Sequence, residues 1–177
     1  MKIKAGSKAK DIILPSISGG VFDTSTLRGR PYMISFFRFA SCPFCNMRVH
    51  QLVKRFEEFG EDFTIVAIFD SSLDNLIMHA NRHHAQFPIL ADGKNIYYRA
   101  YGIERSLMGM LKGMFLRMPT LISGLLKGYL PLAIKGSILT MPADFLVDRQ
   151  GVIRAAYYGK DEGDHMDMEE VMEFSNS

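Results

Sequence analysis

The sequence has few of the residues that build disulfide-rich or zinc-rich proteins: its 177 residues include two cysteines and no tryptophan. Two cysteines cannot form a disulfide framework or a four-cysteine zinc site. Charge of one sign is also lacking, because 21 basic residues face 19 acidic ones, and the net charge of +2 gives no indication of nucleic-acid binding. These absences exclude the disulfide-rich, zinc-cluster and strongly basic classes of protein.

Long apolar runs are absent as well. No uninterrupted stretch reaches the roughly eighteen residues that a membrane-spanning helix needs, since the most apolar segment, 113–134, is interrupted by two basic residues and two prolines. Residues 1–8 carry lysines with no apolar segment behind them, so we expect no secretory signal and a cytoplasmic protein. The length fits one domain, 1–177, that buries roughly 70% of its unfolded surface.

The two cysteines form a Cys-Pro-Phe-Cys motif at 42–45. The bulky run 31–37 in front of the motif predicts a buried strand. Behind it, apolar residues at helical spacing between 46 and 59 predict a helix that ends at Gly60. The motif is therefore expected in a short loop that joins a strand to a helix.

A helix start is the place where a thiol becomes reactive, because unpaired N–H groups and the helix dipole stabilise a thiolate there. We place Cys42 at that start, exposed, and Cys45 one turn further on as the resolving thiol. Pro43 suits the first helical turn, where its missing N–H is not needed. Arg38, four residues upstream, adds positive charge.

Two other interpretations of the motif compete with a redox dithiol: half of a zinc site and a pair of inert buried cysteines. A half zinc site would need a second Cys-x-x-Cys or Cys/His pair, which the sequence lacks. Free cysteines are also often buried and inert. In a reducing compartment, however, an isolated Cys-x-x-Cys is more often reactive than structural, and we favour the dithiol.

Strands and helices alternate along the rest of the chain. Short strands are expected within 11–30, longer strands at 63–69 and 87–91, a hairpin at 144–148 and 152–158, and helices at 73–85, 95–101 and within 161–174. This order predicts an α/β domain with a mixed sheet.

Residues 103–138 break this alternation. They are rich in glycine, methionine and leucine, and they contain five basic residues and one acid. Three roles fit such a segment: a helical insertion that completes the core or a dimer contact, a lid over an apolar substrate, or a membrane-surface contact. We favour the first.

The histidines suggest no metal site. His79 and His83 lie four apart on a predicted helix, which is ligand spacing, but no carboxylate or cysteine is placed to complete a site. A polar, solvated helix face explains both. His165, with Asp164 before it, is interpreted as part of the cap of the tail helix.

Three groups of residues resemble the redoxin, or alkyl hydroperoxide reductase/thiol-specific antioxidant (AhpC/TSA), family. The opening is similar in Gly6-Ser7, Asp11 to Pro15, Gly20 and Leu27 to Pro31, which precede the strand and the motif. The middle is similar in Phe87 to Asp92 with Tyr101-Gly102, and the late part in Met141 to Gly151. The likeness covers most of the chain and omits 103–138.

The resemblance implies a thioredoxin-like three-layer sandwich with a mixed central sheet and with 103–138 inserted before the late hairpin. It also implies that Pro142 matches the cis-proline that faces the dithiol, so that Cys42, Cys45 and Pro142 are the expected catalytic residues. The residues expected to bind or activate the substrate are Arg38, Pro43, Phe44 and Met141.

Two signatures of related families are missing. The Pro-x-x-x-Thr/Ser-x-x-Cys pattern of peroxiredoxins fits neither cysteine, and Pro142 stands where those enzymes carry an arginine. Thioredoxins have an aspartate six residues before the first cysteine, where this chain has Phe36, so the carrier of the resolving proton is not identified. The likeness is to the branch with Cys-Pro-x-Cys.

We therefore predict a thiol-disulfide oxidoreductase of the peroxiredoxin-like class that contributes to cell redox homeostasis, in which Cys42 attacks and Cys45 resolves. One alternative is a thiol peroxidase that reduces hydroperoxides as an antioxidant. Another is a redox-controlled module that binds a partner or a membrane through 103–138. The expected electron donor is a thiol protein or a low-molecular-weight thiol; a homodimer or membrane contact would use 103–138. No cofactor, metal or nucleic acid is expected.

Overall fold

A five-stranded mixed sheet forms the middle of the computed structural model, which describes residues 2–129 and 136–177. The strand order is β5-β4-β3-β6-β7, with β3, β4 and β5 parallel and with β6 antiparallel to both β3 and β7. The strands are β3 (Tyr32–Phe37), β4 (Thr64–Phe69), β5 (Ile89–Ala91), β6 (Ala143–Val147) and β7 (Ile153–Tyr158). The predicted mixed sheet is confirmed.

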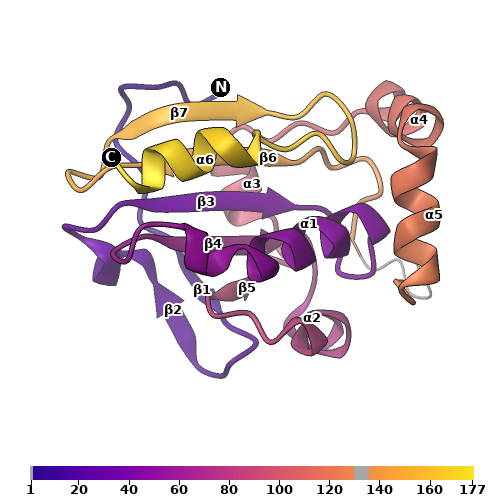
Figure 1. The fold of residues 1–177 in the computed structure, drawn as a ribbon, viewed down its shortest axis with the longest axis horizontal. Helices are drawn as coiled ribbons and strands as arrows, with labels where there is room; N and C mark the ends of the chain where they lie inside the picture. Colours follow the sequence, from indigo (N-terminus) through magenta and orange to yellow (C-terminus); the bar gives the residue numbers. More distant parts are fainter. Residues whose placement is uncertain (1, 130–135) are drawn as a thin grey trace.

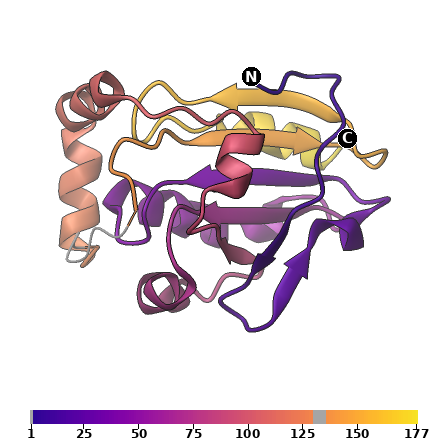
Figure 2. The same ribbon diagram turned by 180° about the vertical axis from the view of Figure 1, so that it is seen from behind.

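Helices cover both faces of this sheet. One face carries α1 (Pro43–Lys54), α2 (Leu73–Ala80) and α6 (Met168–Ser175), as Figure 1 shows. The other face carries α3 (Ile96–Ala100) and the N-terminal segment, which lie in front of the sheet in Figure 2. That segment contains a separate hairpin of β1 (Ile13–Pro15) and β2 (Val21–Asp23), and three short 3-10 turns complete the order: η1 (Thr24–Leu27), η2 (Phe56–Glu58) and η3 (Asn81–His83). The chain therefore forms a three-layer sandwich.

The central strand β3 is buried along its whole length. Because side chains alternate across a strand, Met33 and Phe37 pack under α1 and α6, while Ile34 and Phe36 pack on the opposite side. A strand covered on both faces has apolar residues at nearly every position, and this explains why the run 31–37 is continuous rather than alternating. The strand ends at Phe37, so the loop with the cysteine motif begins inside the protein.

Two helices of the segment 103–138 stand at one end of the sheet: α4 (Leu107–Leu116) and α5 (Met118–Leu126). In Figure 1, α5 runs across the end of the sheet where α1 begins. The two helices contact each other, and α5 also packs on α1. The helical insertion predicted over 103–138 stays a prediction, because its part at 130–135 lies outside the described residues. Among the described residues, no helix has the length and apolarity to cross a membrane.

Candidate active site

The cysteine motif lies at the junction of β3 and α1, as the sequence predicts. Cys42 is the residue before the helix, with an extended backbone (φ −64°, ψ 120°), and Pro43 is the first helical residue. Cys45 follows one turn later. Both cysteines are free thiols with no exposed surface.

The expected exposure of Cys42 is wrong, because α5 covers the start of α1. Gly124 of α5 approaches so closely that a Cβ atom there would lie 3.1 Å from Cβ of Pro43. Leu121, one turn earlier on α5, packs against the apolar cluster that contains both cysteines. A side chain at 124 would therefore require Pro43 to move by a few tenths of an ångström.

Arg38 is the basic residue at the thiols. Its backbone N–H donates to Sγ of Cys45 at 3.3 Å, and its Nη1 lies 3.6 Å from Sγ of Cys42. The remaining guanidinium nitrogens donate to backbone carbonyls, Nε to Thr140 at 3.0 Å and Nη2 to Ile138. The side chain is 4% exposed, so this charge is held in place and shielded little by water.

The surroundings of the two thiols separate their pKa values. Burial by itself raises the pKa of Cys42, but the Cys45 thiol, the charge of Arg38 and the N–H groups of Cys45 and Phe44 outweigh burial and lower the pKa to about 6. Burial and the neighbouring Cys42 sulfur raise the pKa of Cys45 well above its usual value. At neutral pH the first sulfur is therefore a thiolate and the second a thiol, the arrangement that a nucleophile and a resolving thiol need.

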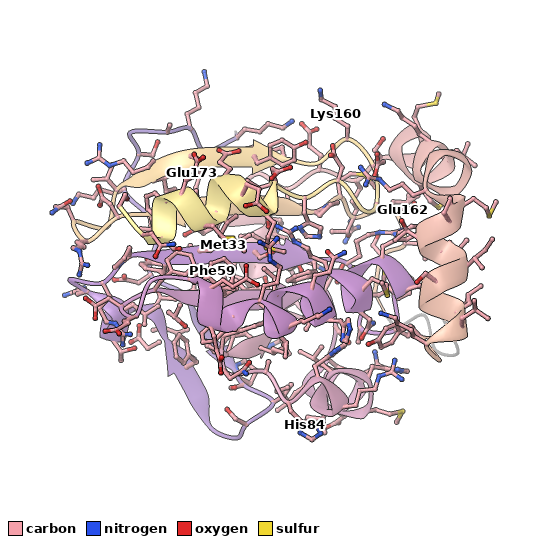
Figure 3. The ribbon with its side chains drawn as sticks, in the orientation of Figure 1. Met33, Phe59, His84, Lys160, Glu162 and Glu173 are labelled. Atoms are coloured by element: carbon pink, nitrogen blue, oxygen red, sulfur yellow. The ribbon has the colours of Figure 1, made fainter. Side chains whose placement is uncertain are left out.

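A buried acid, Glu162, also faces Arg38. One of its carboxylate oxygens lies 3.7 Å from Nη1 of Arg38, and its side chain is 3% exposed. Figure 3 places Glu162 beside α5, whereas Lys160 on the same loop points outward. Burial raises the pKa of Glu162 to about 7, against the opposing charge of Arg38 and with a further increase from Cys42. The local sequence does not point to Glu162, because this residue stands in an acidic stretch that resembles a solvated helix.

A second hydrogen-bonded group holds the loop that carries Cys42. The Nδ2 atom of Asn46 donates to the carbonyls of Ala40 and Cys42, at 2.8 and 2.9 Å. Its Oδ1 lies 2.8 Å from Nε2 of His83, which also stacks on Tyr129. Burial lowers the pKa of His83 to about 4, so the ring is neutral and donates this bond. His83 thus belongs to the support of the motif, rather than to a solvated helix face.

Pro142 differs from the expectation. The structure has no cis peptide bond in the residues it describes, so the bond before Pro142 is trans. Pro142 is buried at the entrance to β6, where its carbonyl accepts from the N–H of Gly159. Met141 donates its N–H to the backbone carbonyl of Glu104. The segment reaches the thiols through Thr140, whose carbonyl binds Arg38.

Below the motif, a second buried carboxylate joins α6 to the sheet. Asp144 of β6 accepts from Ser35 Oγ at 2.6 Å, from the Met166 N–H at 2.7 Å and from His165 Nδ1 at 3.0 Å. The interpretation of His165 as part of a cap is therefore wrong: its ring points inward, and Asp167 caps α6 by accepting from the Glu169 N–H.

A cavity of about 410 Å³ opens beside the motif, between α1, α5 and the start of α6. Phe44 lines it, together with Arg48 of α1 and Arg117, the residue before α5. Neither cysteine lines it. The cavity reaches the helix that carries the dithiol but not the sulfur atoms.

The family model for the AhpC/TSA family matches residues 5–156, so the chain belongs to this family. Membership places it among thiol-dependent oxidoreductases and peroxidases of thioredoxin-like fold. No curated protein matches the sequence.

Solved structures share the fold at low sequence identity. Peroxidoxin BcpB from Mycobacterium tuberculosis is 17% identical with a TM-score of 0.65, over 88% of this chain and 86% of that one. A putative thiol:disulfide interchange protein DsbE from Chlorobium tepidum is 20% identical with a TM-score of 0.57, over 89% and 86% of the two chains. A yeast mitochondrial 1-Cys peroxiredoxin is 11% identical with a TM-score of 0.68, over 96% and 73%.

Proposed function

We propose that the protein is a thiol-disulfide oxidoreductase that uses the Cys42-Cys45 dithiol and contributes to cell redox homeostasis. The observation that carries the proposal is the difference between two neighbouring thiols. Cys42 has a lowered pKa beside Arg38, and Cys45 has a raised one. A pair with this difference has one sulfur ready to attack and a second that reacts only after the first is consumed.

In the proposed reaction the Cys42 thiolate attacks one sulfur of a substrate disulfide. A mixed disulfide forms, and the other substrate sulfur leaves as a thiolate that takes up a proton. Cys45 then loses its proton and attacks Cys42, which releases the second substrate thiol and leaves a Cys42–Cys45 disulfide. A dithiol protein or a low-molecular-weight thiol returns two electrons; the yeast relative is described with glutathione and thioredoxin systems.

The expected site residues take different parts in this proposal. Arg38 supplies charge, Pro43 starts the helix, and Phe44 contributes its N–H to the thiolate. Pro142 and Met141 act through the segment that presents the Thr140 carbonyl to Arg38. Because Cys42 is fully buried and α5 packs on Pro43 beside it, we infer that a protein substrate reaches the sulfur only after the surrounding residues move.

Two serine variants test the proposal. With dithiothreitol as donor and insulin as substrate, Cys42→Ser should have no turnover above background. In a separate reaction, pre-reduced Cys45→Ser is mixed with insulin after the dithiothreitol has been removed, and it should accumulate a mixed disulfide on Cys42, detected by mass spectrometry. Val21→Ser, an exposed change on β2, serves as the control and should keep wild-type turnover. Undiminished turnover in Cys42→Ser would contradict the proposal.

The second candidate is a thiol peroxidase, and the burial of Cys42 supports it, since a hydroperoxide is far smaller than a protein disulfide. The thiolate would attack the peroxide oxygen and become a sulfenic acid as the alcohol or water leaves. Cys45 would then condense with it and release water. Stopped-flow mixing of the reduced protein with micromolar hydroperoxide separates the candidates, because a rate no faster than that of free cysteine rejects the peroxidase.

A third candidate is binding to an anionic membrane through 103–138. The outer face of α5 exposes Met118, Ile122, Leu125 and Leu126, while its inner face packs on α1. Residues 105–129 contain four basic residues and no acid, which suits anionic headgroups beside an apolar helix face.

Vesicle co-sedimentation tests this candidate. We expect binding to vesicles that contain phosphatidylglycerol, weaker binding to phosphatidylcholine alone, and loss of binding in Leu126→Glu. Val21→Glu, equally apolar and exposed but distant from α5, is the control. Because α5 packs on α1, the helix that carries Cys45, binding should differ between reduced and oxidised protein. Equal sedimentation of wild type and Leu126→Glu would reject the candidate.

A further inference from the structure

Arg38 has two buried anionic neighbours and one charge. Its Nη1 lies 3.6 Å from Sγ of Cys42 and 3.7 Å from Oε2 of Glu162. The guanidinium of Arg38 and the carboxylate of Glu162 are both almost fully buried. Two negative charges beside a single buried positive charge are unfavourable, so the thiolate and the carboxylate compete for Arg38.

The carboxylate is the incompletely bonded member of this group. Among the described residues, Oε2 of Glu162 has no hydrogen-bond partner although it is buried. A buried, charged oxygen without a hydrogen bond is costly, and protonation removes that cost. Glu162 thus gains a proton easily when Cys42 takes the charge of Arg38.

In the described part of the chain, Arg117 is the second basic residue that influences Glu162, and it is already paired. Arg117, before α5, binds Asp161 at 2.6 Å and Asp164 at 3.5 Å. The groups that influence the charge of Glu162 are Arg38 from the loop after β3, Cys42 at the start of α1, Asp161 on its own loop, and Arg117. Of these, only Cys42 changes its charge in the redox cycle.

We propose that Glu162 stores a proton for the dithiol: it is protonated while Cys42 is a thiolate, and it releases the proton and becomes the counter-ion of Arg38 when Cys42 enters a disulfide. This inference rests on the proposed function. In the first step, Cys42 attacks R–S–S–R′, and the proton of Glu162 ends on the leaving R′–S⁻. In the second, Cys45 gives its proton to the departing R–S⁻. The protein loses two electrons and two protons, and the substrate gains both as RSH and R′SH.

Without Glu162 the protein would release one proton for two electrons, because Cys42 is already ionised. The number of protons appears in the pH dependence of the equilibrium with glutathione, whose disulfide takes up two protons on reduction. The constant in question is for oxidation of the protein dithiol by glutathione disulfide. Between about pH 6 and 7, where reduced Cys42 is ionised and Glu162 still holds its proton, this constant should change little in the wild type. In Glu162→Gln the same constant should fall about tenfold for each unit by which the pH rises, which corresponds to a change of about 30 mV in the potential difference between the two couples.

The experiment measures the fraction of Cys42–Cys45 disulfide in glutathione buffers from pH 5.5 to 8.5. Glu104→Gln, an exposed acid that pairs with Lys2, is the control and should behave as wild type. Equal pH slopes in wild type and Glu162→Gln would overturn the inference and leave the proposed function intact. Failure of the wild type to form the disulfide at all would overturn both.

A second measurement needs only the wild type, so it tests the inference even if Glu162→Gln does not fold. Infrared difference spectra between reduced and oxidised protein should show a carboxylic-acid C=O band in the reduced state that is replaced by carboxylate bands on oxidation. Spectra without such a band change would also overturn the inference. A purely structural Glu162 keeps one protonation state in both redox forms.

Discussion

Two buried carboxylates, Asp144 and Glu162, differ in whether they keep their negative charge in the folded protein. Asp144 accepts three hydrogen bonds, from Ser35, His165 and the Met166 N–H. Burial raises its pKa, but the charge and hydrogen bond of His165, the charge of Arg48 and the hydrogen bond from Ser35 outweigh burial and hold the pKa below the usual value. Glu162 has a 3.7 Å contact with Arg38, and burial raises its pKa to about 7. Nearby positive charge together with hydrogen bonds, more than burial, decides which acid stays ionised. Asp144 joins elements together, whereas Glu162 can exchange a proton near neutral pH.

Removal of the fully bonded acid should have the largest effect. Asp144→Ala leaves His165 and Ser35 without their partner in the interior, and we expect a loss of about 3–5 kcal/mol in the free energy of unfolding. Urea denaturation at pH 7 measures it. Asp11→Ala, which breaks an exposed pair with Arg28, should cost about 0–1 kcal/mol. Similar losses in the two variants would remove the distinction between the buried acid and a surface acid.

Asp144 and Glu162 should affect the pH dependence of the free energy of unfolding in opposite directions. The lowered pKa of Asp144 contributes stability that is present above about pH 3.8 and is lost as the pH falls. Glu162 acts in the opposite sense: the native state holds its proton up to about pH 7 and the unfolded state only to about 4.5, so its contribution falls as the pH rises between these values.

Glu162→Gln should therefore gain stability relative to wild type between pH 4.5 and 7, by up to about 3 kcal/mol at 1.36 kcal/mol per pKa unit. Urea denaturation at several pH values measures the difference, and Glu104→Gln is the matched control. A constant difference between wild type and Glu162→Gln across this range would show that the native pKa of Glu162 is ordinary.

Arg38→Met should lower the reactivity of Cys42 at pH 7. Without the guanidinium the pKa of Cys42 rises from about 6, and the thiolate fraction falls about tenfold for each unit by which the new pKa exceeds 7. The rate of iodoacetamide alkylation against pH measures the shift. Arg38→Lys keeps the charge and should retain part of the reactivity, while Arg28→Met on the surface should change nothing. An unshifted profile in Arg38→Met would mean that the Cys45 thiol and the N–H groups lower the pKa without Arg38.

The smallest effect is expected from a partner of Asp144. Ser35→Ala removes one hydrogen bond to a carboxylate that keeps two others, and we expect a loss of about 1.5 kcal/mol. Thermal unfolding followed by circular dichroism measures it, with Ser18→Ala in the exposed β1–β2 turn as the control. A loss as large as that of Asp144→Ala would mean that Ser35 alone keeps the acid charged.

Local patterns in the sequence predict the strands and helices well. The run 31–37, the helical spacing after the motif and the Gly-containing hairpin each depend on residues that are near each other in the chain, and the structure has β3, α1 and the pair β6–β7 there. Two helices, α4 and α5, lie in the described part of 103–138. Burial of Cys42 could not be predicted in the same way, because it depends on how α5 packs on α1.

The residues that surround the thiols could be predicted only in part. Arg38 is near in sequence and was expected to add charge. Glu162 and His83 come from distant segments whose local pattern resembles solvated helix faces, and Pro142 was expected to be cis on the strength of a resemblance, whereas its bond is trans. Contacts between distant segments depend on the packing of whole elements, which periodicity does not encode.

By itself, the sequence of 177 residues and two cysteines determined the α/β alternation, the place of the dithiol between a strand and a helix, and the family that its motifs resemble. Tertiary structure alone decided which charges face the sulfur atoms and how much water reaches them. Those two quantities set a pKa, and both depend on atoms brought together from the β3 loop, the insertion and the loop after β7. The chemistry of Cys42 is therefore a property of the folded protein rather than of its motif.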